Sequence, residues 1–200
     1  MAAILSSLRN TVIAGFVLAV ILVLLLMQLG TSLDHNFGLS IVRWLHVGSG
    51  VMWIGLLWYF NFVQTPSMPK IPDDQKPAIS KVISPAALFW FRWGAMSTIF
   101  FGLILAQMSG YLVDAVTLGA SEGFAVPKNI TIGIGMWLGT IMWFNVWFVI
   151  WPNQKIALGL VDAAADQKPK AAKLAGQFSR INTLLSIPML LAMVAAKSIV

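Results

Sequence analysis

Apolar residues gather in five long segments that shorter polar stretches separate. Each segment approaches the roughly 20 mostly apolar residues that a membrane-spanning helix needs. The pattern therefore predicts an all-α integral membrane protein with five transmembrane helices in a single membrane domain over residues 1–200. The first segment could instead be a signal peptide, but its length and the lack of a small-x-small cleavage site favour a retained helix. The segments run from about Val12 to Leu29, Leu39 to Val63, Ala86 to Val113, Ile130 to Trp151 and Thr183 to Val200.

Lysine and arginine are distributed unevenly between these segments. Most of them lie in the stretches 64–85 and 152–182, whereas the stretch 30–42 has none and 114–129 has only Lys128. Basic loops face the cytoplasm in membrane proteins. The charge pattern therefore predicts cytoplasmic loops at 64–85 and 152–182, with the N-terminus inside and the C-terminus outside.

The composition excludes several classes of protein. Hydrophobic residues make up 58% of the chain and charged residues 10%, and the mean hydropathy is +0.83. Too few polar side chains remain to cover a soluble enzyme or to keep a chain disordered. The net charge of +6 is explained by cytoplasmic loops, so no nucleic-acid partner is expected. With no cysteine the chain has no disulfide, thiolate nucleophile or covalent c-type haem.

The second and fourth segments contain a repeated sequence. Both are expected to run from outside to inside, which predicts a parallel repeat of helix pairs 2-3 and 4-5. Residues present in both copies are expected to serve packing: the glycines let helices approach closely, and the asparagines hydrogen-bond between helices. The shared residues are Gly48 and Gly133, Gly50 and Gly135, Met52 and Met136, Trp53 and Trp137, Gly55 and Gly139, Phe60 and Phe144, and Asn61 and Asn145.

His46 has no counterpart in the repeat, because Thr131 occupies the matching position. An ionisable residue inside a span marks a functional site by default. Neutral imidazole can bind haem iron or another metal, or relay protons. The alternative is a histidine that is hydrogen-bonded to a neighbouring helix. Gln107 is predicted at a similar depth on the third helix, and His35 is a weaker candidate, because Gly38 argues against an early helix start.

Two arginines complete the set of candidate binding residues. Arg43 lies three residues before His46 on the same helix side, so the pair could hold a haem iron and a propionate. Arg92 lies inside the third segment, and no acidic residue in any span can pair with it. It is expected either to snorkel and contact Asn61 or Asn145, or to bind an anionic guest.

Three stretches resemble the membrane-bound bacterial urate oxidase (urate hydroxylase) family, whose members join a multi-span membrane domain to a C-terminal cytochrome c. The second stretch is the most specific; the first also resembles runs in copper-resistance and other small haem or metal membrane proteins. The segment Phe91-Arg92-Trp93-Gly94 adds to the likeness. The three stretches are Arg43 to His46 with Trp53 to Gly55 and Phe60, Gly139 to Trp147 with Ile150 to Lys155, and Ser179 to Thr183 with Ser186 to Pro188.

This resemblance implies a multi-pass protein of the bacterial inner (cytoplasmic) membrane that oxidises urate and delivers electrons to a cytochrome. Two departures bear on activity. The cytochrome c domain is expected to be missing, so a separate cytochrome c would be the partner. Ile181 also stands where the family commonly has histidine, and Ala195-Ala196-Lys197 where it often has another.

Three functions stay open from the sequence. The first is a urate hydroxylase-like oxidoreductase, with haem b as a possible cofactor and His46 as its ligand. The second is a non-catalytic membrane subunit of a larger respiratory or energy-transducing complex, since glycines and aromatic residues suit helix packing. The third is a small haem- or copper-handling membrane protein that uses His46, Met52 and Met136.

Overall fold

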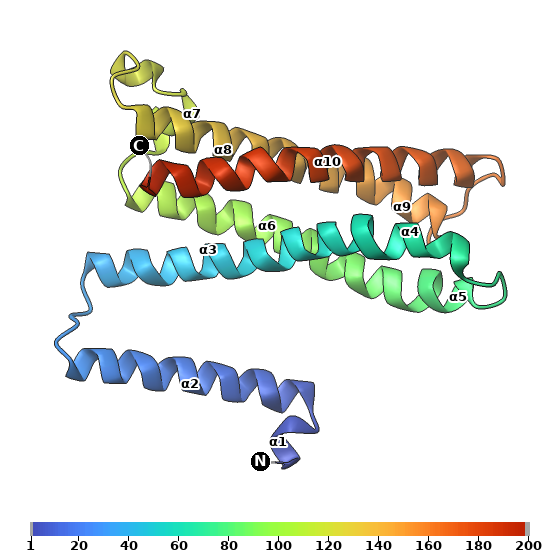
Figure 1. The fold of residues 1–200 in the computed structure, drawn as a ribbon, viewed down its shortest axis with the longest axis horizontal. Coiled ribbons are helices and arrows are strands. Elements are labelled where there is room, and N and C mark those ends of the chain that lie inside the picture. Colours follow the sequence, from blue (N-terminus) through green and yellow to red (C-terminus); the bar gives the residue numbers. More distant parts are fainter. Residues whose placement is uncertain (1, 199–200) are drawn as a thin grey trace. The chain divides into compact units, whose positions relative to one another are not determined.

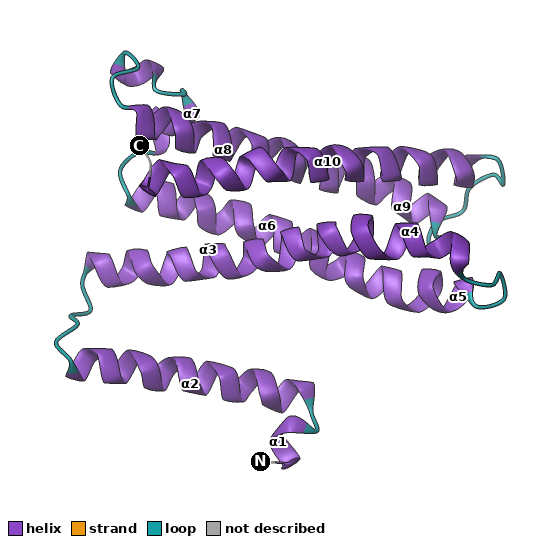
Figure 2. Ribbon diagram, in the orientation of Figure 1, coloured by secondary structure: helices purple, strands orange, loops and turns teal. Residues whose placement is uncertain are grey.

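The computed structural model describes residues 2–198, and these residues form helices and loops only (Figures 1 and 2). Five helical stretches are long and apolar enough to cross a membrane. The number of helices that could span a membrane is therefore as predicted, although the helices begin or end several residues from the predicted limits. The five stretches are Leu8–Gln28, His35–Lys70, Lys76–Met108, Pro127–Ala157 and Gln167–Ser198.

The chain divides into two compact units, residues 1–41 and 42–200. The first unit contains α1 (Ala2–Leu5), α2 (Leu8–Gln28) and the first turns of α3 (His35–Trp58). Ser7 caps α2 through the Asn10 N–H group, and the Asp34 carboxylate accepts the Phe37 N–H group at 3.0 Å. Asp34 thus supplies one of the acceptors that the free N–H groups at the start of α3 require.

The second unit is the helix bundle. After α3 the chain passes through five short helical elements and returns through α6. It then passes α7 and η4, continues through α8, η5 and α9, and returns through α10. Helix α10 packs along α8, and α6 also contacts α8. The elements are η1 (Tyr59–Gln64), α4 (Thr65–Ser67), η2 (Met68–Lys70), α5 (Lys76–Ala78), η3 (Ile79–Ile83), α6 (Ser84–Met108), α7 (Leu112–Val116), η4 (Ala120–Glu122), α8 (Pro127–Phe144), η5 (Asn145–Ile150), α9 (Trp151–Ala157) and α10 (Gln167–Ser198).

Three spans widen into π-helix, and each π segment ends two residues before a proline. These segments are η1, η3 and η5, which precede Pro66, Pro85 and Pro152. A proline inside a helix lacks an N–H donor, and its ring clashes with the carbonyl of residue i−4. In each case the residue before the proline donates to the carbonyl five residues back, as Thr65 does to Phe60. The wider turn therefore accommodates the proline without ending the span.

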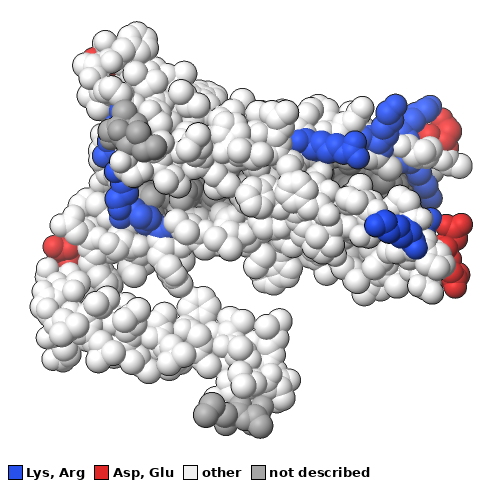
Figure 3. Space-filling view, viewed as in Figure 1, with Lys and Arg blue, Asp and Glu red and all other residues white. Residues whose placement is uncertain are grey.

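Helix α10 begins sixteen residues before the predicted span, at Gln167 rather than Thr183. Pro169 lies in its first turn, where a proline costs no hydrogen bond. Much of the predicted cytoplasmic loop 152–182 is therefore helical. The basic residues of this loop and of 64–85 lie at one end of the bundle (Figure 3).

A buried row of polar groups on α10 ties it to other helices. Asn182 accepts a hydrogen bond from Asn145 at 2.8 Å and donates one to the Met142 carbonyl at 2.9 Å. Ser186 accepts from the indole of Trp58 at 3.0 Å, and Ser179 from Asn61 at 2.8 Å. Both repeated asparagines therefore bond between helices, as the sequence predicts. The apolar core around them consists of Trp53, Ile54, Leu57, Leu88, Phe91, Ala95, Met142, Val146, Ile150, Ala175 and Met189.

Candidate functional site

A cavity of about 730 Å³ lies in the second unit between α3, α6, α8 and α10. Its volume is in the range of small-molecule binding sites. The walls are mostly apolar and include Trp53, Trp58 and Ile54. Some lining side chains are exposed, such as Val51 (69%) and Val194 (64%). The cavity is therefore open to the surface of the bundle rather than sealed.

Glycines create much of this space. Gly55 and Gly139 both line the cavity, and a Cβ atom added to either would meet nothing within 4 Å. The predicted close helix approach is correct for Gly135, whose added Cβ would lie 3.3 Å from Ala192, and also for Gly133, which lies against the Ala115 carbonyl. It is wrong for Gly48, Gly55 and Gly139, where an added Cβ atom would meet nothing within 4 Å.

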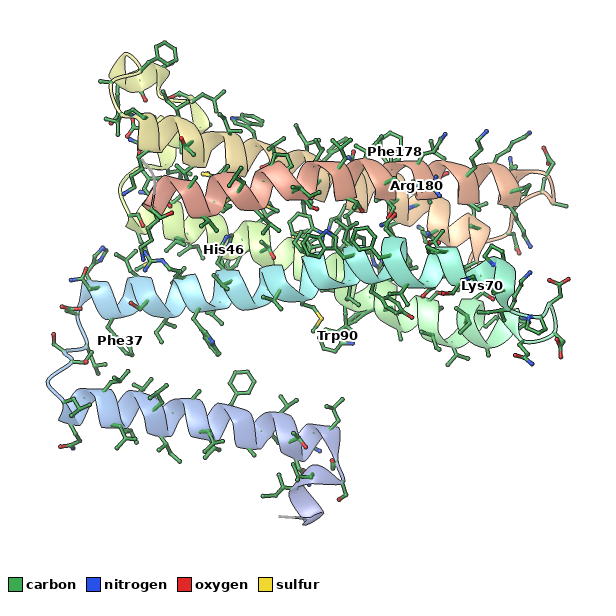
Figure 4. The ribbon with its side chains drawn as sticks, viewed as in Figure 1. Phe37, His46, Lys70, Trp90, Phe178 and Arg180 are labelled. Atoms are coloured by element: carbon green, nitrogen blue, oxygen red, sulfur yellow. The ribbon has the colours of Figure 1, made fainter. Side chains whose placement is uncertain are left out.

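His46 occupies a wall of the cavity, with its ring between α3 and α6 (Figure 4). Nδ1 lies 2.9 Å from the backbone carbonyl oxygen of Thr98. Because a carbonyl only accepts hydrogen bonds, Nδ1 carries the proton when the imidazole is neutral, and Nε2 keeps its lone pair. Nε2 has no hydrogen-bond partner among the described residues. The imidazole is therefore both held by a neighbouring helix and able to accept a proton or bind a metal at Nε2.

Gly102 on α6 leaves the space that the imidazole of His46 occupies. A Cβ atom at Gly102 would lie 2.9 Å from Cε1 of His46 and 3.0 Å from Nδ1. Distances this short are not sterically possible, so any side chain at 102 must displace the ring. The glycine on α6 is thus required for the observed position of His46.

The mouth of the cavity carries three cations from three helices: Arg43 on α3, Lys128 on α8 and Lys197 on α10. In Figure 3 a group of blue side chains borders a hollow at one end of the bundle. The basic stretches 64–85 and 152–182, called the lysine-rich loops below, lie at the opposite end. No carboxylate lines this cavity in residues 2–198. The site therefore has a positive opening above apolar walls.

Tyr111 and Ser109 also line the cavity at this end. Tyr111 is half-buried, and burial raises the pKa of its hydroxyl, although a hydrogen bond with Ser109 and the charge of Arg43 act against the rise. The phenol therefore stays neutral at physiological pH and keeps a proton that it can donate.

Arg92 lies elsewhere and does not line the cavity. Its Cζ atom is 3.3 Å from the ring centroid of Trp151, and its Nε donates to the Leu88 carbonyl at 3.1 Å. No hydrogen bond joins it to Asn61 or Asn145, which bond to α10 instead. The indole face of Trp151 attracts the guanidinium of Arg92. Arg92 therefore contacts an aromatic ring rather than the amide oxygens of Asn61 or Asn145 that the sequence suggested.

The remaining candidates lie apart from His46. Gln107 is exposed on α6 and is not part of the cavity wall. His35 is the first residue of α3, so the helix does begin early despite Gly38. Within residues 2–198 no group of three or more His, Asp or Glu residues could hold a metal ion. Of the four predicted binding residues, the structure brings only Arg43 and His46 together in the cavity.

The sequence reasoning missed four contributors to this site: Thr98, Gly102, Lys128 and Lys197. Thr98 acts through its backbone, so its side chain gives no signal. Lys128 and Lys197 did give a sequence signal. They are basic residues at the end of the bundle where the positive-inside pattern leaves few other cations.

The family model described as urate oxidase N-terminal matches residues 104–198. This range covers the end of α6 and all of α7, α8, η5, α9 and α10, and so includes one wall of the cavity with Lys128 and Lys197. Two of the three resembling stretches fall inside it, whereas the stretch with Arg43 and His46 does not. The match supports a relationship to the urate oxidases. No curated protein and no solved structure matches the chain.

The two places where the resemblance led us to expect histidine lie in different surroundings. In the stretch Ala195 to Lys197, where the resemblance led us to expect histidine, Ala196 and Lys197 line the cavity, whereas Ile181 is 42% exposed and is not part of the wall. A change at 197 therefore alters the site itself. A change at 181 alters the outer surface of α10.

Proposed function

We propose that this chain is a urate-oxidase-like membrane redox protein that oxidises urate or a closely related purine and passes electrons to a separate cytochrome c. The observation that carries the proposal is the family match over the helices that form one wall of a cavity containing His46. A single imidazole with a free Nε2 suits proton removal from a purine or attachment of a redox metal.

Haem b is the proposed cofactor, and His46 and Arg43 are the residues that would hold it. Nε2 of His46 would bind the iron, since the Thr98 carbonyl fixes the proton on Nδ1. Arg43, at the mouth of the same cavity, would pair with a propionate. The bound group would supply one-electron redox chemistry. The apolar walls around His46 are consistent with such a guest.

The proposed location is the bacterial inner membrane, with the N-terminus and the lysine-rich loops in the cytoplasm. Clustering of the basic loops at one end of the bundle supports this orientation. We also propose that helix pairs 2-3 and 4-5 arose by duplication. The π segments η1 and η5 support this, because the repeated asparagines Asn61 and Asn145 lie in them.

A haem- or copper-handling role is the second candidate. Met136, Met189 and Met193 line the cavity together with His46. Thioether and imidazole groups are ligands for copper(I). Copper in the purified protein that is lost in both His46→Ala and Met193→Leu would favour this role.

The main test combines an absorption spectrum with an activity assay. The purified full chain is expected to show a haem band and to consume urate when oxidised cytochrome c is supplied. His46→Ala should lose both, whereas His35→Ala, which changes the only other histidine, should keep both. A wild-type protein with no redox centre and no urate consumption would show the proposal to be wrong.

A further inference from the structure

The three cations at the cavity mouth are not explained by membrane orientation. The positive-inside bias places basic residues at the opposite end of the bundle, where most of the 13 Lys and Arg residues lie. Arg43, Lys128 and Lys197 come from three separate helices and nevertheless line one opening. An opening lined by charges of one sign attracts ligands of the opposite sign.

Neighbouring acids do not pair with these cations. The ion pairs among the described residues, Lys76 with Asp73 and Lys170 with Asp166, do not involve the three cations. In the α7–α8 connection, Asp114 accepts a hydrogen bond from Ser121 at 2.7 Å. Glu122 accepts one from Asn129 at 2.8 Å. Both carboxylates thus hydrogen-bond within their own segment, and no carboxylate of residues 2–198 forms an ion pair with Arg43, Lys128 or Lys197.

The walls below the mouth restrict the kind of anion that fits. Trp53, Trp58 and Ile54 form apolar surface, and Gly139 leaves room beside it. A small inorganic anion would gain nothing from these walls, whereas an organic anion could bury its apolar body there and keep its charged edge near the cations.

We infer that the cavity binds a dissolved organic anion with a flat apolar body, which enters between Arg43, Lys128 and Lys197 from the side of the membrane opposite the lysine-rich loops. The inference rests on the proposed function only for the choice of urate as the probe. The cations attract the anion to the opening and hold its charged edge, and the neutral hydroxyl of Tyr111 in the same cavity offers a hydrogen bond.

The test measures binding of urate and of caffeine, a neutral purine, by quenching of tryptophan fluorescence in the full chain in nanodiscs. The variants are Arg43→Gln, Lys128→Gln, Lys197→Gln and the triple variant. Matched controls are Lys70→Gln and Lys173→Gln, which remove exposed lysines at the other end of the bundle. Each mouth variant should weaken urate binding by about 1.5-fold to fivefold, the range for exposed charge pairs. The triple variant should approach the product of these factors.

Varying the salt concentration and the ligand charge distinguishes two causes of weaker binding: loss of electrostatic attraction at the mouth and a general loss of folded structure. Raising the ionic strength to 0.5 M should weaken urate binding to the wild type and leave the triple variant unchanged, because salt screens exposed charges. Caffeine binding should not respond to the mouth variants or to salt. Equal urate affinity in the wild type and the triple variant, or equal losses for urate and caffeine, would overturn the inference.

Two further outcomes distinguish this inference from the proposed function. If the triple variant loses a haem band while its urate affinity is unchanged, the cations bind haem propionates and the inference is wrong. If urate is bound with the expected charge dependence but is never oxidised, the mouth is confirmed and the proposed redox function fails. Sidedness is tested in oriented vesicles, where urate added to the face bearing the lysine-rich loops should not quench fluorescence.

Discussion

The imidazole Nδ1 of His46 lies 2.9 Å from the carbonyl oxygen of Thr98, and this bond joins α3 to α6. The acceptor belongs to the backbone, since the Thr98 hydroxyl donates to the Gly94 carbonyl on its own helix. The orientation of His46 therefore depends on the path of α6 rather than on the chemistry of a side chain. Substitutions on α6 can therefore move the imidazole of His46 without removing it from the protein.

Gly102→Ala is expected to displace His46 without removing it. The new Cβ would lie 2.9 Å from Cε1, so the ring must rotate away from Thr98. Loss of a partner that orients a metal ligand typically costs about tenfold to a hundredfold in affinity. Haem content and urate affinity should fall by about that factor. Thr98→Val is the control, because it keeps the carbonyl, and wild-type binding by Gly102→Ala would contradict the assigned role of His46.

Gly139→Leu is expected to fill the cavity. The position opens onto free space, so the side chain should enter the cavity, reduce urate affinity at least about tenfold and change the free energy of unfolding by under about 1 kcal/mol. Gly135→Leu provides the contrast. Its side chain would meet Ala192 and Met193 and should cost about 1–3 kcal/mol. Binding titrations and thermal unfolding in detergent measure the two effects, and unchanged binding in Gly139→Leu would show that the guest lies elsewhere.

Asn182→Ala is expected to loosen α10. Asn182 is fully buried and bonds both Asn145 and the Met142 carbonyl. Its removal leaves the Asn145 amide without that acceptor, which costs about 1–3 kcal/mol. Asn61→Ala removes a half-buried bond to Ser179 and should cost about 0.6 kcal/mol, the average for hydrogen bonds between membrane helices. Unfolding titrations in mixed micelles should rank the two variants in this order.

Arg92→Gln is expected to affect stability alone. The guanidinium lies over Trp151, a contact worth about 0.5–2 kcal/mol, and it is not part of the cavity wall. The variant should unfold at lower temperature while urate affinity and haem content stay unchanged. A selective loss of binding would instead place Arg92 in an anion site, as the sequence allowed.

The spans could be predicted from the sequence because the requirement for apolar length acts locally. The limits of the helices could not, since Asp34 extends α3 to His35 and Pro169 is tolerated in the first turn of α10. The π segments were also missed. Their signal was present in Pro66, Pro85 and Pro152, but a proline predicts a break as readily as a wider turn.

The site could be predicted only in part. His46 stood out because a lone ionisable residue in a span is costly, and Arg43 followed from its spacing on the same helix. Arg92 drew equal attention for the same reason, yet its partner Trp151 lies 59 positions away in sequence (151 − 92). Such pairing depends on how helices are rotated in the bundle, which hydropathy does not encode.

The polar row on α10 has a consequence for biogenesis. Trp58, Asn61 and Asn145 all precede their acceptors Ser186, Ser179 and Asn182 in the chain. During synthesis these donors reach the bilayer before α10 exists, and each is without its final acceptor until the last span arrives. The last helix thus supplies the acceptors that the earlier ones lack, and a chain that stalls before it would leave the indole of Trp58 and the amide of Asn145 unsatisfied in the bilayer, whereas Asn61 keeps its bond to the Leu57 carbonyl.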